Sequence, residues 1–275
     1  MVAPVRQARS EPHDQPRPGE LGCYDPDYVR RRAPQWKRFL HRYFRVDVRG
    51  LDNLPDRPFV GAGNHSGGVL IPDTLVWLSA YHSEHRKTPL LTLAHDAMFS
   101  VYPAALSRWA ARFGAIRADR TLALEGLRRG CAVQVYPGGD HDACRSFFRR
   151  HEIVFAGRKG YVELAQQAGV PIVPVASTGG HETLVVLSEG RNLARWLGLD
   201  RSRRLVAFPV TLSVPWGLWV GPLPGYIPLP ARIEIEVLPA IDPRGSIDDV
   251  DARVRAALQQ AVSGMAARRR LPWFG

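Results

Sequence analysis

A histidine and an aspartate beside a glycine-rich turn are the strongest candidates for chemistry in this chain. Residues 59–73 read FVGAGNHSGGVLIPD, so that His65 follows a short apolar run and Asp73 lies eight positions later. Glycines at a strand end let the backbone approach a ligand closely and leave the imidazole accessible. A histidine with a nearby carboxylate can act as a general base with an orienting acid. Because single histidines near loops are more often structural or merely exposed, this motif alone leaves both roles open.

Two further segments combine glycine turns with polar side chains. Residues 113–145 read FGAIRADRTLALEGLRRGCAVQVYPGGDHDACR, in which two arginines precede a helical pattern and a strand-like run ends at Pro137-Gly138-Gly139. Residues 157–183 read GRKGYVELAQQAGVPIVPVASTGGHET, which is a basic turn, a helical pattern, a buried strand and a second glycine turn. Each segment is ordinary for an α/β protein, and their order carries more information than any one of them.

Other chemistries fit the sequence less well. The histidines and aspartates lack the two-ligand helical spacing of a zinc protease, which makes a metal-dependent hydrolase a minor alternative. Ser66 lacks the G-x-S-x-G surroundings of a hydrolase nucleophile, and it stands where a dinucleotide-binding fingerprint requires glycine. Three cysteines without a C-x-x-C pair predict neither a disulfide framework nor a zinc site, and they favour a reducing compartment.

Alternating strand and helix patterns must position these residues. Apolar runs of strand length at 59–63, 90–94, 132–136 and 171–175 alternate with helical patterns at 74–81, 98–113, 122–129 and 160–168. This alternation predicts a single α/β domain over residues 47–275, with a largely parallel central sheet flanked by helices. Residues 232–237 alternate polar and apolar side chains, which predicts a strand with one wet face. Ser246 with Asp249 predicts the start of the last helix.

A basic amphipathic helix is expected at residues 21–46, ahead of the domain. One helical face carries an aromatic stripe and the opposite face is rich in arginine; the stripe consists of Trp36, Phe39, Leu40, Tyr43 and Phe44. This composition is typical of a helix lying on anionic lipid, but it fits packing against the protein's own core equally well. Residues 1–20 hold four prolines and no apolar run, which predicts a disordered leader rather than a signal peptide.

The net charge favours an anionic partner. Lys and Arg number 37 against 26 Asp and Glu, a formal net charge of +11, and the usual partners of such an excess are nucleic acid and anionic membranes. The sequence has no nucleic-acid-binding motif, so we expect no nucleic acid partner. Residues 205–231 carry no charged side chain, and their six prolines argue against a transmembrane helix. That stretch, like the basic and aromatic residues 268–274, fits a lipid surface, although core strands are an equal alternative for 205–231.

Taken in order, these segments resemble the glycerolipid and lysophospholipid acyltransferases, in particular their diacylglycerol-acyltransferase-like branch. The family pattern has Asn-His with a downstream Asp, then G-x-I-x-x-x-R, then a strand running into F-P-x-G, and then V-P-I-V-P-V. The corresponding segments here are Asn64-His65 with Asp73, residues 114–120, residues 136–139 and residues 170–175. The resemblance covers about residues 45–245.

The resemblance implies a reaction and a setting. His65 would take the proton from an acceptor hydroxyl that attacks the thioester of the co-substrate acyl-CoA, Asp73 would hold the imidazole, and no metal or other cofactor would be needed. The residues implied to line the substrate site are Asn64, Gly67, Gly68, Arg117, Arg120, Pro137, Gly138, Gly139 and Asp142. The expected partners are acyl-CoA, a lipid acceptor and an anionic membrane, with the protein peripheral on the cytoplasmic face.

Two departures from the family pattern bear on this interpretation. Seven residues separate His65 from Asp73, where the commonest family motif has four, and this keeps open a non-catalytic lipid-binding protein of the same fold. Gly138 stands where phosphate-using members have glutamate. The second departure favours an acylglycerol, a lysophospholipid or another lipid alcohol over lysophosphatidic acid as the acceptor.

Overall fold

A seven-stranded sheet forms the centre of the computed structural model, which describes residues 16–68, 70–84, 88–190, 196, 209–221, 223 and 225–269. Its strand order is β1-β10-β6-β2-β5-β3-β4, and only β10 and β6 run antiparallel to each other. The strands are β1 (Asp47–Arg49), β2 (Val60–Gly63), β3 (Leu90–Ala94), β4 (Ala115–Arg117), β5 (Ala132–Val135), β6 (Ile172–Thr178) and β10 (Glu234–Val237). The structure thus confirms the predicted α/β fold with a largely parallel sheet.

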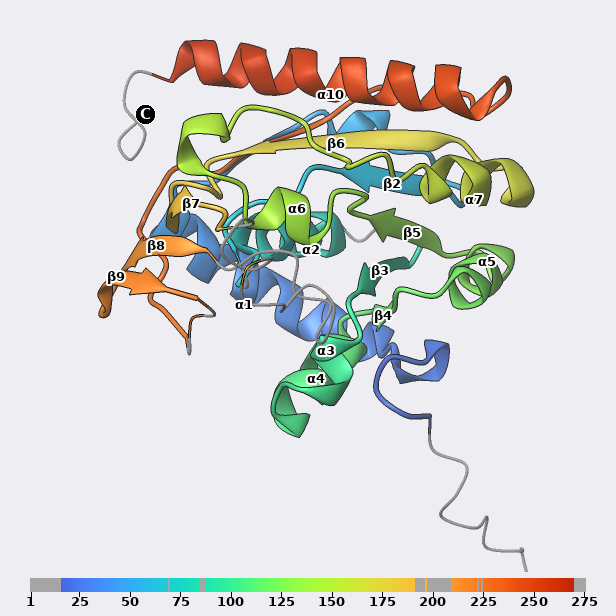
Figure 1. Ribbon diagram of the computed structural model, residues 1–275. Helices are drawn as coiled ribbons and strands as arrows, with labels where there is room; N and C mark the ends of the chain where they lie inside the picture. Colours follow the sequence, from blue (N-terminus) through green and yellow to red (C-terminus); the bar gives the residue numbers. More distant parts are fainter. Residues whose placement is uncertain are drawn as a thin grey trace, which may run out of the picture.

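Helices cover both faces of this sheet (Figure 1). One face is covered by α5 (Arg120–Arg128), α7 (Gly160–Ala168) and α10 (Ile247–Arg268), and the other by α1 (Pro26–Phe44) and α2 (Pro72–Ser83). Side chains of β6 enter both cores, Ile172 and Ala176 the first and Val173 and Val175 the second. Because β6 is buried on both faces, its sequence is a continuous apolar run rather than an alternating one.

Local signals explain several element ends. The last helix begins as predicted, since the backbone amide of Asp249 donates to the hydroxyl of Ser246 at 3.1 Å. The helix expected over 98–113 is instead two, α3 (Ala97–Ser100) and α4 (Ala104–Arg112), because Pro103 between them has no amide to continue the first helix. Shorter helical turns are η1 (Leu21–Cys23), η2 (Leu51–Asn53), α6 (Asp140–Ala143) and η3 (Phe147–Arg149).

The prediction of a wet face on the strand near residue 235 was wrong at Glu234, although Arg232 and Glu236 are partly exposed. Glu234 in β10 is buried, and its carboxylate lies 3.3 Å from a guanidinium nitrogen of Arg232 and 3.5 Å from one of Arg269. The side chain of Arg269 is itself almost completely buried, and it also pairs with Glu182 at 3.0 Å. Charged side chains can alternate with apolar ones in a buried strand when each charge finds a partner, so the alternation did not indicate solvent.

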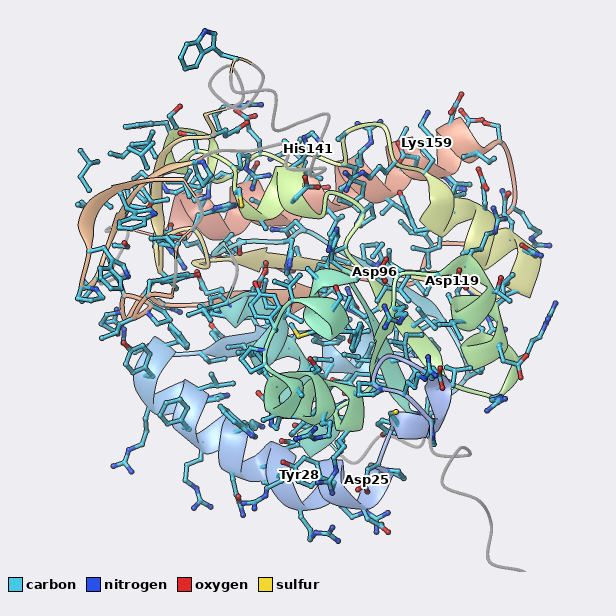
Figure 2. All side chains as sticks on the ribbon, turned by 60° about the horizontal axis from the view of Figure 1, so that its bottom comes forward. Asp25, Tyr28, Asp96, Asp119, His141 and Lys159 are labelled. Atoms are coloured by element: carbon cyan, nitrogen blue, oxygen red, sulfur yellow. The ribbon has the colours of Figure 1, made fainter. Side chains whose placement is uncertain are left out.

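The aromatic stripe of α1 packs mainly on the protein itself. The backbone amide of Tyr28 donates to the Asp25 carboxylate at 2.8 Å at the start of the helix (Figure 2). Leu40 and Phe44 are buried in the core shared with α2 and the sheet. Phe39, by contrast, is 58% exposed. The core-packing alternative therefore holds for most of the stripe, and no described helix is both long and apolar enough to cross a bilayer.

Part of the chain's N-terminal segment lies against the domain. The backbone amide of Arg117 donates to the carbonyl of Gly19 at 3.0 Å, which places the residues just before η1 beside β4. Residues 1–15 of the expected leader and residues 270–275 of the basic tail lie outside the described residues.

A second, smaller sheet lies at one end of the molecule (Figure 1). It is antiparallel, with the order β7 (Val185–Ser188), β8 (Val210–Ser213) and β9 (Gly217–Val220). Its second and third strands come from the uncharged stretch of the sequence. The described part of that stretch therefore forms strands and turns.

Candidate active site

Three loops meet where β2, β5 and β6 end. β2 lies between β5 and β6 and is parallel to both, so the residues that follow the three strands converge at one edge of the sheet. The rings of His65, after β2, and Tyr136, after β5, stack with centroids 4.5 Å apart. The buried Asn64 side chain donates to the carbonyl of Ser177 at 2.9 Å and accepts from its amide at 2.8 Å, which ties the His65 loop to β6. Ligands of open α/β sheets bind at this edge.

His65 and Asp73 meet despite the long interval between them. His65 Nδ1 lies 3.6 Å from Asp73 Oδ2, with the His65 side chain 13% exposed and Asp73 2% exposed. The connecting loop reverses through Gly67 and Gly68, whose φ angles of 82° and 65° suit glycine. Pro72 then begins α2, and Asp73 occupies its first turn.

The Asp73 carboxylate is held in one orientation by neighbouring donors. It accepts hydrogen bonds from the amide of Ser66 at 2.8 Å, the hydroxyl of Ser66 at 3.1 Å and the amide of Thr74 at 2.8 Å. A carboxylate in the first turn of a helix also interacts favourably with the helix dipole. The Nδ1–Oδ2 distance of 3.6 Å exceeds a hydrogen bond, so the Asp73 carboxylate lies beside the imidazole without a hydrogen bond to it.

The orientation of the His65 ring leaves one nitrogen for chemistry. Nδ1 lies 3.4 Å from the hydroxyl of Thr74, on the same side as Asp73. No described residue makes a hydrogen bond to Nε2. Burial, together with the Asp73 carboxylate, raises the pKa of the Tyr136 phenol, so the ring stacked on His65 stays neutral.

The Pro137-Gly138-Gly139 turn packs tightly against its neighbours, most of all at Gly138. A Cβ on Gly138 would overlap the carbonyl oxygen of Val154, and one on Gly139 would lie 2.6 Å from a guanidinium nitrogen of Arg158. Arg158 donates to the carbonyl of Gly138 at 3.2 Å and to that of Pro137 at 3.4 Å. The sequence analysis missed Arg158, whose only signal was its place in a basic turn between two glycines.

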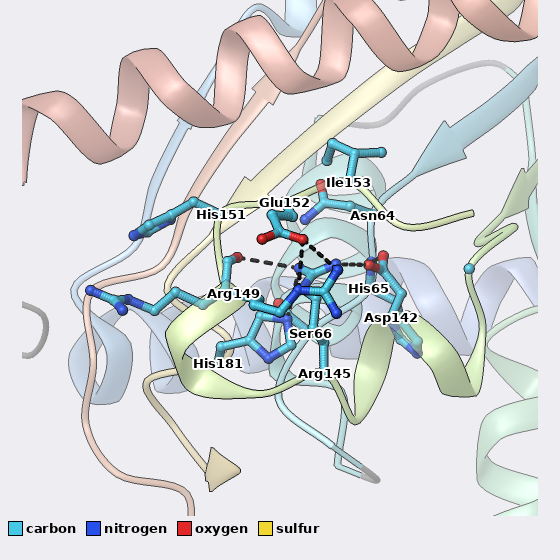
Figure 3. Close-up of polar contacts among 12 residues, drawn as sticks. Asn64, His65, Ser66, Asp142, Arg145, Arg149, His151, Glu152, Ile153 and His181 are labelled. Carbon is cyan, nitrogen blue, oxygen red and sulfur yellow. Dashed lines mark hydrogen bonds and ion pairs between the residues drawn. The ribbon is translucent and has the colours of Figure 1, made fainter. Parts of the chain in front are cut away.

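The Asp142 carboxylate holds the backbone of His65 in place (Figure 3). Its Oδ2 accepts the backbone amide of His65 at 2.5 Å, and its Oδ1 pairs with Arg145. The Asp142 side chain is 0% exposed and that of Arg145 1%. Burial raises the pKa of Asp142, and the charge of Arg145 opposes that rise. The carboxylate predicted to line the substrate site therefore holds the backbone of the candidate base.

Arg145 is anchored by two further contacts. It donates to the carbonyl of Arg150 at 3.2 Å and to Nε2 of His181 at 3.0 Å. Burial, with the charge of Arg145 adding to it, holds the pKa of His181 well below its usual range, so the neutral imidazole can accept this bond. The sequence placed Arg145 and His181 in two segments with glycine turns but gave neither a role, because the contact between them joins positions 36 residues apart.

Two predicted site residues, Arg117 and Arg120, form ion pairs. Arg117 pairs with Asp96 at 3.1 Å (Asp96 is labelled in Figure 2), and Arg120, the first residue of α5, pairs with Glu163 of α7 at 2.6 Å. Their described partners thus lie outside the three loops around His65. Among the described residues, no three His, Cys, Asp or Glu side chains are placed to hold a metal ion.

The loop that carries His65 also contacts the segment that follows the small sheet. The Tyr226 hydroxyl donates to the carbonyl of Gly67 and accepts the amide of Leu70 at 3.2 Å. A Cβ on Gly68 would lie 2.5 Å from the Leu184 side chain. The His65 loop is therefore held between the main sheet and the apolar segments around the small sheet.

Known proteins share both the sequence pattern and the fold. The family model described as Acyltransferase matches residues 45–178. An uncharacterised protein of Mycobacterium tuberculosis is 31% identical over 255 residues, which are 88% of this chain and 67% of that protein. The "DGAT1/2-independent enzyme synthesizing storage lipids" of Gallus gallus is 23% identical over 226 residues, 82% of this chain and 60% of its own length.

A solved structure shows the same fold. The crystal structure of the 1-acyl-sn-glycerophosphate acyltransferase PlsC from Thermotoga maritima superposes with a TM-score of 0.56 at 19% identity, covering 90% of this chain and 85% of that one. The four motifs, the family match and this fold agree with one another. The chain belongs to the PlsC-like family of glycerolipid and lysophospholipid acyltransferases.

Proposed function

We propose that this protein is a membrane-associated O-acyltransferase that moves a fatty acyl group from acyl-CoA to a hydroxyl of an acylglycerol, a lysophospholipid or another lipid alcohol. The observation that carries the proposal is the His65–Asp73 pair, 3.6 Å apart at the end of a central strand, with Nε2 of His65 turned away from Asp73. The protein would act at the cytoplasmic face of the membrane, where both substrates meet.

In the proposed reaction, Nε2 of His65 takes the proton of the acceptor hydroxyl as its oxygen attacks the thioester carbonyl. The tetrahedral intermediate collapses, the C–S bond breaks, and the departing thiolate receives the proton back from the imidazolium. The products are an ester and free CoA, so the imidazole returns to its neutral form. A positioned general base of this kind supplies about 10²–10⁴-fold in rate, and the Asp73 charge stabilises the imidazolium between the two proton transfers.

Two observations support an acylglycerol, a lysophospholipid or another lipid alcohol over lysophosphatidic acid as the acceptor. Gly138 stands at the glutamate position of the phosphate-using motif. The arginines of the second motif, Arg117 and Arg120, are paired with Asp96 and Glu163. In addition, the chicken relative is named as an enzyme that synthesises storage lipids, which fits acylglycerol acceptors.

The test is acyl transfer by purified protein in liposomes that contain anionic lipid. Radiolabelled long-chain acyl-CoA, or the same acyl group on acyl carrier protein, is offered with monoacylglycerol, diacylglycerol, lysophospholipid and lysophosphatidic acid. Wild type is compared with His65→Ala and His65→Gln, and with His41→Ala as a control on α1. We expect label in a neutral glycerolipid or lysophospholipid from acyl-CoA with wild type and His41→Ala only.

Each other result has a defined meaning. Full turnover by both His65 variants would remove the general base from the proposal. Transfer only from acyl carrier protein would replace the donor, and transfer only to lysophosphatidic acid would replace the acceptor. Liposome binding without any product would favour the non-catalytic lipid-binding alternative.

A further inference from the structure

Strands β8 and β9 of the small sheet carry apolar side chains on an exposed face. Leu212 pairs with Leu218 and Val210 with Val220 across β8 and β9, so these side chains share one face, whereas Thr211 pairs with Trp219 on the other. Leu218 is 65% exposed and Thr211 only 1%. Antiparallel sheets with one solvated face normally bury the apolar side chains and expose the polar ones.

The buried hydroxyls do not explain this arrangement. No described residue makes a hydrogen bond to Oγ1 of Thr211 or to Oγ of Ser213, although both atoms are buried. An unpaired buried hydroxyl costs about 1–3 kcal/mol. A register shift of one residue would expose the hydroxyls and bury the leucines. An apolar surface that covers the leucines would offset the cost of the observed register.

The apolar face extends beyond the paired strands. Val214, next in the same row, forms an antiparallel bridge with Ile227, and both are exposed. Trp216 at the turn is exposed as well. We call this surface the outer face, defined by Leu212, Val214, Trp216, Leu218, Val220 and Ile227. Residues 209–221 hold no charged side chain, so the outer face has no polar interruption along β8 and β9.

The basic C-terminal end of α1 lies beside the segment that follows the outer face. The Tyr43 hydroxyl donates to the carbonyl of Pro228 at 2.6 Å, and Arg45 donates to the carbonyl of Pro230 at 3.3 Å, which fixes the end of α1 beside the segment after Ile227. Arg38 and Arg42 are exposed on the same helix. An apolar face with basic side chains nearby is complementary to an anionic bilayer, whose acyl region takes the apolar side chains and whose headgroups attract the basic ones.

We propose that the outer face docks on the surface of an anionic lipid bilayer. The inference rests on the proposed function in one respect, namely that the acceptor is a membrane lipid. The Tyr226 hydroxyl, one residue before Ile227, binds both sides of the loop that follows His65, so docking here brings the candidate active site to the membrane. The aromatic stripe of α1 has a different role, since Leu40 and Phe44 are buried in the core.

The test measures binding to sedimented vesicles without any chemistry. Vesicles of phosphatidylcholine, with and without one third phosphatidylglycerol, are mixed with wild type, with Leu218→Asp/Val220→Asp, and with the control Ala252→Asp/Ala256→Asp. The test variant places two acids on the edge strand β9, where charges are tolerated, and the control places two acids on exposed positions of α10. Circular dichroism and Tm compare the folding of all three.

We expect the test variant to bind vesicles at least about tenfold more weakly than wild type and control, and wild type to bind better when anionic lipid is present. Equal binding by test variant and control overturns the proposal. The proposal is also overturned if the wild type does not bind vesicles but forms a dimer, and if the two substitutions of the test variant abolish that dimer. A second copy would then cover the outer face. If the test variant unfolds, Leu218→Thr/Val220→Thr replaces it, since threonine suits strands.

A second readout separates this inference from the enzymatic proposal. His65→Ala leaves the outer face intact and is expected to bind vesicles as wild type does, even if no acyl transfer is found with any protein. Quenching of tryptophan fluorescence by brominated lipid should fall when Trp216 is replaced by Phe. Quenching that is unchanged in Trp216→Phe contradicts the placement of the outer face in the bilayer.

Discussion

Asp142 and Arg145 form a buried ion pair. We expect that replacing one of the two residues lowers the unfolding free energy much more than replacing both together. Both side chains are at most 1% exposed, and Arg145 is the only described ion-pair partner of Asp142. Arg145→Met leaves the Asp142 carboxylate buried, with the backbone amide of His65 as its remaining described hydrogen-bond donor. Asp142→Asn leaves the guanidinium with the carbonyl of Arg150 and the imidazole of His181.

The magnitudes follow from these contacts. Removing one partner of a buried ion pair typically costs about 3–5 kcal/mol, because the other charge stays buried without compensation. Removing both charges and keeping the volume is often close to neutral. We therefore expect about 3–5 kcal/mol of lost unfolding free energy for Arg145→Met and for Asp142→Asn, and at most about 2 kcal/mol for the double variant. The coupling energy between the two positions is then at least about 4 kcal/mol.

The assay is urea unfolding followed by circular dichroism and tryptophan fluorescence on all four proteins of the cycle. Coinciding transitions from the two probes establish two-state unfolding, which the cycle requires. Additive losses, with a coupling energy below about 0.5 kcal/mol, would refute the assignment of a buried, mutually dependent pair. Losses below about 1 kcal/mol for both single variants would refute it as well.

The same pair makes a prediction about turnover. In an Arg145→Met background, Asp142→Asn keeps a side-chain oxygen for the His65 amide, whereas Asp142→Leu removes it. If Asp142 positions the candidate base, the asparagine form retains acyl transfer and the leucine form loses kcat by about tenfold or more, with KM changed less. Equal kcat values for the two forms, at equal folded fractions, would leave Asp142 with a purely structural role.

Three further outcomes are expected. Asp73→Asn removes the charge beside His65 and should lower kcat by about 10²-fold; a loss under threefold in the liposome assay contradicts the charge-partner role. Burial lowers the pKa of His82 to about 4. In the unfolded chain the His82 imidazole has a pKa near 6.5, so on acidification it takes up a proton before the folded protein does. The unfolding free energy is therefore unaffected above pH 6.5 and falls as the pH drops toward 4, by about 2 kcal/mol between pH 7 and 5. Urea titrations should show that the unfolding free energy of His82→Leu depends less on pH. Gly179→Ala should lower the unfolding free energy by about 1–3 kcal/mol more than Gly130→Ala in the same titrations. Both glycines have positive φ, but only a Cβ at position 179 would meet a backbone carbonyl. Equal losses of unfolding free energy would show that this contact does not contribute to stability.

The order of elements was accessible from the sequence because it is encoded by local patterns. The helix at 160–168 and the strand at 90–94 have the predicted bounds, and the helix cap at Ser246 has the predicted partner. Periodicity and capping depend on neighbours a few residues apart, so the chain carries these signals regardless of its final packing. The motif order likewise identified the family, since each motif is a short, contiguous segment.

The candidate site was accessible only in part. His65 and Asp73 were recognisable as chemical groups, but the sequence did not reveal that a seven-residue interval would close to 3.6 Å. That distance depends on the positive φ angles of Gly67 and Gly68 and on the helix start at Pro72. Arg158 escaped notice because its partners lie in the loop after β5, about twenty residues away, which no local pattern connects to it. Arg145 escaped notice because its local spacing to Asp142 does not reveal that both side chains are buried.

Local patterns in the sequence predicted most of the central elements and the motifs that follow them, and they showed that α1 and residues 205–231 carry apolar faces. The surface that each face meets became known from the folded molecule alone. The α1 stripe and the outer face have similar apolar character, yet Leu40 and Phe44 lie in the core and Leu212 and Leu218 at the surface. The hydrophobic effect has no preferred direction. An amphipathic pattern therefore indicates which face is apolar, but not which surface that face contacts. Chain topology makes that choice, because it fixes which elements lie close enough to pack.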